Sequence, residues 1–471
     1  MSAGAVAYAR ENAGRFLDEL KTLLRIPSVS TTPEHKGDVE KAAEWVASEL
    51  RRIGMEHVEV IRAAEGHPLV YADWLHAAGK PTVLCYAHYD VQPPDPLDEW
   101  VSPPFEPTER NGNLYARGAV DDKGQLVTQL KALESLLHPT TPKPGVSGAP
   151  GSQDGKLPIN VRVIYEGEEE VGGERIAGFV QEHPERLKAD FALISDTEMF
   201  APELPTLCVG LRGMIYTELE VRGAKTDLHS GMYGGAAPNP FVALAQIIAG
   251  LKDRDGKILI PGFYDDVKAP SGDELAAWKK LPFDEEEYRE KEVGASKLVG
   301  EKGYSAIERT WARPTLDVHG IVGGFIGAGA KTVIPAKATA KVSMRLVPDM
   351  TPEKAFRQYK EYVEKIKPEG VTVEVRLIHS GEAIVIGTDN PYVKAATTAL
   401  KKVWGKDTVF IRSGGSIPIV GDFEKHLKIP SVMMGFGLPD DGLHAPNEKF
   451  CIGNFHRGIE SLIEFFDEVG A

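Results

Sequence analysis

The chain has 471 residues, of which 54 are basic and 69 are acidic, so its formal net charge is −15. At about 150 residues per domain, this length predicts two or three domains, and a composition of 42% hydrophobic and 26% charged residues is typical of a globular protein. The excess of acidic residues disfavours nucleic acids and anionic membranes as partners, because both are negatively charged themselves.

The sequence carries no signal for a membrane or a secreted protein. No apolar run approaches the roughly 18 residues needed to span a bilayer, and the N-terminus lacks the pattern of a signal peptide. Cys85, Cys208 and Cys451 lie in apolar segments, which predicts buried thiols and not disulfides or a cysteine zinc site. We therefore expect a cytoplasmic protein.

The first 200 residues alternate helical and strand patterns. Helices are predicted at residues 16–24, 38–53, 122–137 and 174–187, and strands at residues 69–74, 82–86, 160–165 and 190–194. This alternation predicts an α/β domain with a mostly parallel central sheet flanked by helices. Residues 139–158, rich in Pro, Gly, Ser and Thr, are predicted to form a loop.

The pattern changes near residue 213. Strands are predicted at residues 215–221, 338–346 and 371–378, and helices at 241–251 and 356–366, around a charged tract at 253–310. These strands and helices together predict a smaller α+β layer with one exposed sheet face. A strand at 431–435 and a helix at 454–469 follow. The sequence therefore predicts a main domain of residues 1–212 and 380–471, interrupted by an inserted domain of residues 213–379.

Histidine and acidic residues follow several apolar, strand-like runs of the main domain. The carboxyl ends of neighbouring parallel strands form one crevice, so these residues could converge. Imidazole and carboxylate without thiolate suit a pair of zinc, manganese or cobalt ions, and a shared carboxylate can bridge two metals about 3.5–4 Å apart. The candidates are His88, Asp121, Glu169 or Glu170, Asp196 and His444.

Each of these motifs has an ordinary explanation when it is taken alone. A run such as Glu168–Glu170 is commonly a solvated face or a helix N-terminus, and Asp121-Asp122 could simply cap the helix that follows. His444 by itself would be a turn histidine. The metal interpretation depends on all of the motifs recurring after strand-like runs.

Taken together, the motifs resemble a family of co-catalytic metallopeptidases. It includes carnosine and other cytosolic dipeptidases, glutamate carboxypeptidases, acetylornithine deacetylase and succinyl-diaminopimelate desuccinylase, and the motif order is most similar to the dipeptidase branch. The matching segments are residues 88–93, 100–104, 115–124, 166–173, 195–196, 227–231, 329–335, 345–348, 414–418 and 444–448.

The resemblance implies a dinuclear metal centre with zinc as the first choice and manganese or cobalt as alternatives. One ion would be bound by His88 and Asp196, and the other by Glu170 and His444. Asp121 would bridge the two ions. These assignments come from the matching motifs and not from spacing alone.

The resemblance also assigns the acid–base chemistry. Glu169 would be the general base, Asp90 would orient His88, and the peptide bond between Asp121 and Asp122 would be cis. Family members usually have a non-acidic residue where Glu168 stands, so the register across Glu168–Glu170 is open by one residue.

The inserted domain is expected to act as a lid and to form a homodimer. The resemblance implies that His229 reaches the neighbouring subunit's site, while Thr332, Arg345 and Ser416 hold the carboxylate end of the substrate. Arg345 could instead be a surface arginine, and Ser416 an ordinary turn serine.

These assignments predict a dinuclear metal-dependent dipeptidase acting on dipeptides with a free C-terminal carboxylate. The alternative within the family is an N-acyl-amino-acid deacylase or a carboxypeptidase. A non-catalytic metal-binding relative is a third hypothesis, which the retained Glu169 disfavours.

Overall fold

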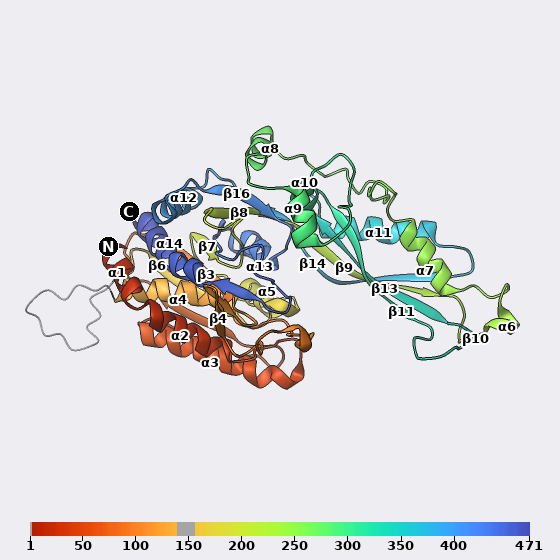
Figure 1. Ribbon diagram of the computed structural model, residues 1–471, viewed down its shortest axis with the longest axis horizontal. Coiled ribbons are helices and arrows are strands. Elements are labelled where there is room, and N and C mark those ends of the chain that lie inside the picture. Colours follow the sequence, from red (N-terminus) through yellow and green to blue (C-terminus); the bar gives the residue numbers. More distant parts are fainter. Residues whose placement is uncertain (1, 139–155) are drawn as a thin grey trace, which may run out of the picture. The chain divides into compact units, whose positions relative to one another are not determined.

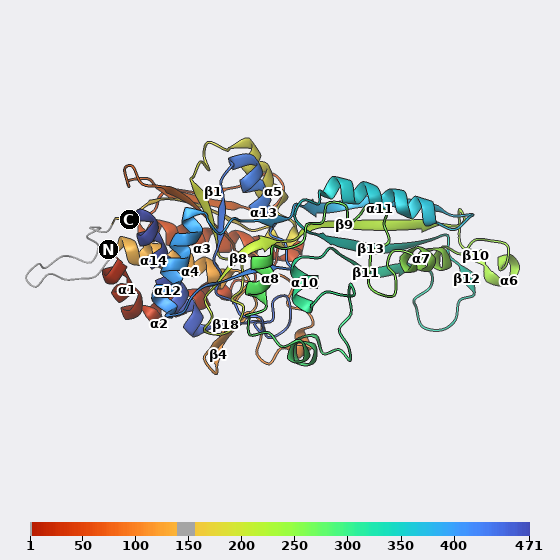
Figure 2. The same ribbon diagram turned by 90° about the horizontal axis from the view of Figure 1, so that it is seen from above.

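The structure, a computed structural model, describes residues 2–138 and 156–471. It contains two compact units (Figures 1 and 2). Unit 1 comprises Met1–Val209, Ile386–Ile411 and Asp422–Ala471, and unit 2 comprises Gly210–Val385 and Arg412–Gly421. Most of the loop predicted at 139–158 lies outside the described residues. None of the described helices is both long enough and apolar enough to cross a membrane.

Unit 1 is built around a large mixed sheet with strand order β1-β2-β6-β3-β7-β17-β8. Its strands are β1 (Glu56–Ile61), β2 (Leu69–Trp74), β3 (Thr82–His88), β6 (Asn160–Glu166), β7 (Phe191–Ile194), β8 (Thr206–Leu211) and β17 (Ser431–Met433), with β16 (Val409–Ser413) paired to β8. The neighbours β6, β3, β7 and β17 are parallel, whereas the outer pairs β1–β2, β2–β6 and β17–β8 are antiparallel. The predicted α/β class is confirmed, with parallel strands confined to the centre of the sheet.

Helices pack against this sheet and against one another (Figure 1). They are α1 (Ser2–Glu11), α2 (Ala13–Leu24), α3 (Lys36–Ile53), α4 (Lys123–Leu137), α5 (Glu174–Glu182), α12 (Pro391–Trp404) and α14 (Ile452–Gly470). Helix α4 packs on β3 and is buried along its whole length, because α1, α2, α3 and α14 also pack on it. Helix α5 ends earlier than predicted, because Pro184 disfavours a helical conformation at the residue before it.

A small sheet of unit 1 joins two distant parts of the chain. Strands β4 (Thr108–Arg110), β5 (Asn113–Tyr115) and β18 (Lys449–Cys451) form it in the order β18-β5-β4. Strand β18 is antiparallel to β5, with Lys449 opposite Tyr115. This register brings the segment before β18 beside the segment after β5.

Unit 2 contains a four-stranded antiparallel sheet in the order β11-β13-β9-β14. The strands are β9 (Gly213–Arg222), β11 (Thr315–Gly323), β13 (Lys337–Leu346) and β14 (Thr372–Gly381), and a separate two-stranded ribbon is formed by β10 (Leu228–His229) and β12 (Val333–Ile334). The helices are α6 (Ser230–Tyr233), α7 (Pro240–Ala249), α8 (Gly272–Trp278), α9 (Glu285–Glu287), α10 (Ala306–Trp311), α11 (Pro352–Ile366) and α13 (Pro418–Asp422), and the strand β15 (Ile384–Val385) follows β14.

The four-stranded sheet has one buried face. Side chains that alternate along β9 and β13, such as Leu219 and Val342, form a core with Leu244 of α7 and Tyr359 of α11. The residues between them, including Arg345, point to the opposite face because side chains alternate along a strand. On this opposite face Glu220, Thr339 and Ser343 are buried and Arg345 is half-buried, so the face expected to be exposed is covered in part at its central strands.

Candidate metal centre

The predicted ligands of unit 1 come from the carboxyl ends of neighbouring parallel strands and from two loops. His88 is the last residue of β3, and Asp196 lies two residues beyond β7. Glu169 and Glu170 lie in a single helical turn, Glu169–Val171, shortly after β6. Because β6, β3 and β7 are adjacent and parallel, these three chain segments leave the sheet at the same edge.

The side chains form two triads that share Asp121. His88, Asp121 and Asp196 make the first, and Asp121, Glu170 and His444 make the second; within each triad the potential ligand atoms all lie within 4.8 Å of one another. Asp121 faces both histidines, with Oδ1 3.1 Å from Nε2 of His88 and Oδ2 3.0 Å from Nε2 of His444. The shared carboxylate thus has the arrangement of a bridging ligand.

The separations fit metal coordination. Nε2 of His88 lies 3.9 Å from Oδ2 of Asp196, and Nε2 of His444 lies 3.3 Å from Oε2 of Glu170. Two ligands on one tetrahedral zinc, each about 2.0–2.1 Å from the metal, are about 3.3 Å apart. Small adjustments would therefore let each triad close around a cation.

His88 is held in the form that a metal requires. Its ring is fully buried, and Nδ1 lies 3.3 Å from Oδ1 of Asp90 and 3.1 Å from the backbone oxygen of Asp90. Nε2 is buried and makes no hydrogen bond. A proton on Nδ1, donated to Asp90, leaves the lone pair of Nε2 available to a cation. Asp90 therefore lies where a residue that orients His88 is expected.

Asp90 also holds the turn that carries the glutamates. Its carboxylate accepts hydrogen bonds from the backbone N–H of Glu169 (3.3 Å) and of Glu170 (3.1 Å). The Glu170 side chain is further fixed by Gln92, whose Nε2 donates to Oε2 at 2.8 Å. We did not predict the role of Gln92, because an amide two residues after Asp90 gives no sequence signal of its own.

The side chains of the three consecutive glutamates, Glu168–Glu170, lie in different environments. Glu168 accepts a hydrogen bond from the backbone N–H of His67 at 3.0 Å, next to Gly66, where a Cβ atom would come within 2.5 Å of the carboxylate. Glu170 faces His444, and Glu169 is half-buried, with its charge close to His88 and Asp196. This geometry favours the register with Glu169 as base and Glu170 as ligand.

The electrostatics show an excess of negative charge. Burial, and then the charge of Asp121, raise the pKa of Asp196 to about 7. Burial also raises the pKa of Glu169 and of Glu170, and Asp121 and Glu170 raise the pKa of His444 to about 10. Divalent cations would remove this repulsion, because their charge is the largest in such a site.

Asp121 lies in a constrained loop just before α4. The peptide bond between Asp121 and Asp122 is cis, as the family resemblance implied. Asp122 is fully buried and accepts a hydrogen bond from the backbone N–H of His88 at 3.1 Å. The residue after the proposed bridging ligand therefore fixes the backbone of another proposed ligand.

In unit 2 the structure brings together two pairs of the predicted substrate-binding residues. Nη1 of Arg345 donates to Oγ of Ser416 at 2.8 Å, and Ser416 in turn donates to the backbone oxygen of Arg212. His229 lies opposite Val333 in the ribbon, beside Thr332, whose backbone oxygen accepts from Ser230.

Arg212, which no motif of the sequence indicates, adds a second cation beside Arg345. Burial, together with the charge of Arg345, lowers the pKa of Arg212 to about 10, and burial also lowers the pKa of Arg345. Two neighbouring guanidinium groups form a suitable site for an anionic group. The signal available in the sequence was only an arginine before a glycine at the start of a strand.

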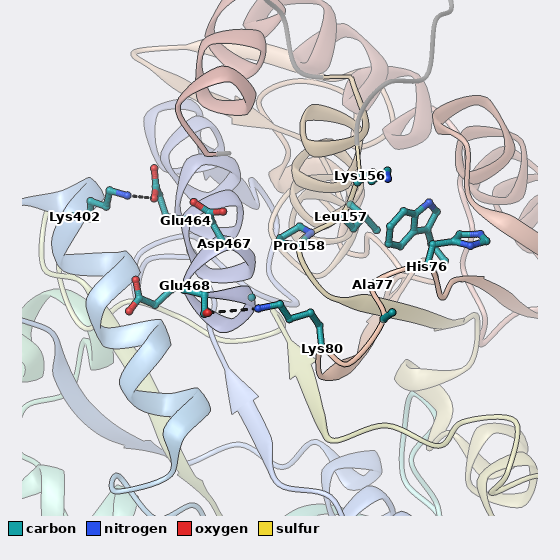
Figure 3. Close-up of a pocket in the computed structure, with 14 residues that line it drawn as sticks. His76, Ala77, Lys80, Lys156, Leu157, Pro158, Lys402, Glu464, Asp467 and Glu468 are labelled. Atoms are coloured by element: carbon teal, nitrogen blue, oxygen red, sulfur yellow. Dashed lines mark hydrogen bonds and ion pairs between the residues drawn. The ribbon is translucent and has the colours of Figure 1, made fainter.

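A pocket of about 360 Å³ elsewhere in unit 1 is lined by none of the triad residues (Figure 3). Among its charged side chains, Lys402 pairs with Glu464, and Lys80 donates to the backbone oxygen of Ala471. In the part of the chain that the structure describes, no group of three potential metal ligands is formed by the lining of this pocket, so the two triads are the candidate metal centre.

Residues 84–468 match the peptidase family M20/M25/M40, and the chain belongs to this family. Cys-Gly metallodipeptidase dug1 of Schizosaccharomyces pombe is 34% identical to it, over 97% of this chain and 96% of that protein. The crystal structure of human carnosine dipeptidase 1 matches with a TM-score of 0.85 at 29% identity, covering 100% of this chain and 98% of that one.

A third relative carries a different name. An M20 family metallo-carboxypeptidase from Sulfolobus solfataricus matches with a TM-score of 0.84 at 32% identity, covering 97% of this chain and 99% of that one. The predicted family is confirmed, and its dipeptidase branch is represented among the similar proteins.

Proposed function

We propose that this protein is a metal-dependent dipeptidase that hydrolyses dipeptides with a free C-terminal carboxylate. The observation that carries the proposal is the pair of His/carboxylate triads that share Asp121. Metallodipeptidases that are similar along nearly the whole chain support it. Hydrolysis needs an activated water and a base, and the same cluster offers ligands for the first and Glu169 for the second.

Two divalent cations per chain would be held by this cluster. His88 and Asp196 would bind one, Glu170 and His444 the other, and Asp121 both. Zinc is our first choice, with manganese or cobalt as alternatives, because the donors are imidazole and carboxylate. When bound, such cations polarise the scissile carbonyl and lower the pKa of water from 15.7 to about 7.

Side chains around the cluster would transfer the proton from the attacking water to the leaving amine. Glu169, half-buried with its charge close to His88 and Asp196, would take the proton from the attacking water and deliver it to the leaving amine. Asp90 would keep Glu169 in place through its backbone N–H, at the same time as it orients His88. One carboxylate would thus fix both a ligand and the base.

Recognition of the substrate would be the task of unit 2. Arg345, with Ser416 and Thr332, would bind the free carboxylate, since a guanidinium offers two parallel donors to it. Unit 2 would then act as the lid domain. It would also form a homodimer: several apolar side chains on and beyond β11 are exposed, namely Val318, Ile321, Val322, Phe325 and Ile326.

His229 would act on the active site of the partner subunit and stabilise the oxyanion. A His229→Ala subunit re-associated with a Glu169→Gln subunit should then recover activity, because one site of the heterodimer has an intact base and an intact partner histidine. No recovery, with subunit exchange verified, would argue against action in trans. We also propose a cytoplasmic location, which the three free cysteines support.

The second candidate function is that of a carboxypeptidase or N-acyl-amino-acid deacylase, which the 32% identity to the Sulfolobus solfataricus metallo-carboxypeptidase favours. Protein reconstituted separately with zinc, manganese and cobalt should be assayed on dipeptides, longer peptides and N-acyl amino acids. Preferred turnover of dipeptides supports the proposal, and preferred turnover of longer peptides or acyl amino acids supports the second candidate. A folded protein that binds no divalent cation would be a non-catalytic relative.

A further inference from the structure

Glu448 is a buried carboxylate outside both triads that is connected to each of them. It follows His444 by four residues and directly precedes β18, and its side chain is fully buried. The pairing of β18 with β5 continues one step further, because the backbone N–H of Ala116 donates to the backbone oxygen of Glu448 at 3.1 Å. The sheet register therefore carries Glu448 to the start of the loop that ends at Asp121.

Both oxygens of Glu448 are used by that loop. Oε1 accepts from the backbone N–H groups of Val120 (3.0 Å) and Asp121 (3.1 Å). Oε2 accepts from the backbone N–H of Gly118 (2.9 Å) and from Nη1 of Arg117 (2.8 Å). One carboxylate thus satisfies three backbone donors in a stretch that is neither helix nor strand.

We propose that Glu448 is a positioning residue, which holds the Arg117–Asp121 loop against the loop of His444 and so sets the bridging Asp121 carboxylate between the two metal sites. The inference rests on the proposed metal centre. Glu448 does not reach substrate or metal in this role, because its oxygens are occupied by loop donors.

The local backbone explains why a carboxylate is needed at this position. Gly118 has a φ of +82°, and a Cβ atom there would come within 2.7 Å of Val91, so the loop adopts a conformation that few side chains permit. A carboxylate offers four lone pairs in two directions, whereas a glutamine amide replaces one oxygen with a donor. Glu448→Gln therefore sets an NH₂ group against two loop donors.

The test is titration of metal-free protein with Mn²⁺ alone. The unmodified protein should bind two ions per chain and give the electron paramagnetic resonance signal of a spin-coupled pair. Glu448→Gln should bind Mn²⁺ about 10–100-fold more weakly, the usual effect of losing a group that orients metal ligands, and the coupled signal should weaken. Glu134→Gln is the matched control, since it removes another buried carboxylate but none of these loop contacts.

The outcomes separate this inference from the proposed function. If the unmodified protein binds no Mn²⁺, the proposed metal centre fails. If it binds two ions and Glu448→Gln binds them with the same affinity and coupling, the metal centre stands and the role of Glu448 is overturned.

A second measurement does not depend on the variant folding. Amide hydrogen exchange of the unmodified, metal-free protein should show protected N–H groups at Gly118, Val120 and Asp121, although they lie outside helices and strands. Exchange at these amides as fast as in exposed loops would also overturn the proposal.

Discussion

Unit 1 contains two clusters of carboxylates, and only one of them is neutralised by Arg and Lys side chains. Glu19, Glu49 and Glu134 lie within 4.8 Å of one another, as do the ligand atoms of each triad around Asp121. The first cluster contains its own cations: Arg52 lies 2.7 Å from both Glu49 and Glu134, and Nζ of Lys131 lies 2.9 Å from Glu49. In the triads the ion pairs of the shared carboxylate are instead with histidines, since Asp121 pairs with His88 and His444.

The pKa values follow this difference. Burial would raise the pKa of Glu134, but hydrogen bonds from Arg52 and the charge of Lys131 outweigh it and lower the pKa to about 2. Burial and the charge of Asp121 raise the pKa of Asp196 to about 7. Both clusters contain buried carboxylates, but Arg and Lys side chains of the chain neutralise the first, whereas divalent cations would neutralise the second.

The largest expected effect comes from Glu169, which would transfer the proton without binding a metal. Glu169→Gln should lower kcat by about 10²–10⁴-fold, the usual contribution of a general base, while both ions remain bound. Glu170→Gln should instead empty one site. Steady-state kinetics with elemental analysis of both variants measure this, and the reverse pattern would show that the register across the three glutamates is shifted.

A substitution in the cluster of Glu19, Glu49 and Glu134 should lower the stability of the protein and leave its turnover unchanged. Glu134→Gln removes one of the two carboxylates that pair with both Arg52 and Lys131, and Glu49 remains. The cost should therefore not exceed the roughly 3–5 kcal/mol of breaking a buried pair completely. Urea unfolding should show this loss, while kcat of the folded variant stays near that of the unmodified protein. A stable variant with impaired kcat would contradict the separation of the two clusters.

Unit 2 contains a cluster of positive charge, in contrast to the two carboxylate clusters of unit 1. Arg345 and Arg212 are neighbouring cations, and the pKa of each is lowered. Arg345→Ala should raise KM for dipeptides and lower kcat/KM by about 10²-fold or more, since a desolvated charge pair contributes roughly 2–5 kcal/mol. C-terminally amidated dipeptides should be poor substrates and lose little further in the variant. Equal rates on dipeptide acids and amides would refute this role of Arg345.

The smallest expected effect is a change in how the free energy of unfolding depends on pH in the acid range. The pKa of Glu134 is lower in the folded chain, about 2, than its ordinary value of 4.5, so the unfolded chain binds more protons between these values. Its contribution to stability is complete above about pH 4.5 and is lost as the pH falls toward 2. The free energy of unfolding of Glu134→Gln should therefore fall less steeply over this range; parallel curves would show that Glu134 is not the cause.

Much of this could be predicted from the sequence, because it depends on local patterns. The alternation of apolar segments indicates the α/β unit, and the helix predicted at residues 38–53 ends as predicted, because Gly54 adopts the left-handed conformation after α3. Strand β11 was missed, because its residues Val318–Gly323 are mostly exposed and lack an alternating pattern. The short helices α8 and α10 lie in the charged tract at residues 253–310 and were not predicted, although each begins with a serine capping box.

The candidate ligands and Asp90 could be named from motifs, but the other residues that contact or position the site residues could not. Gln92, Arg212 and Glu448 act through contacts between residues distant in the sequence: Glu448 binds a loop more than 300 residues earlier in the chain. No periodicity or short motif reports such a contact. Only the register of β18 on β5 brings the two segments together.

The central claim is that the triads share one carboxylate and require external cations. Metal content per chain of Asp121→Asn, measured beside Glu134→Gln after reconstitution with zinc, tests it most directly. We predict two ions in the unmodified protein and in Glu134→Gln, and the loss of both ions in Asp121→Asn, because Asp121 faces His88 and His444 alike. Two tightly bound ions in folded Asp121→Asn would contradict the account.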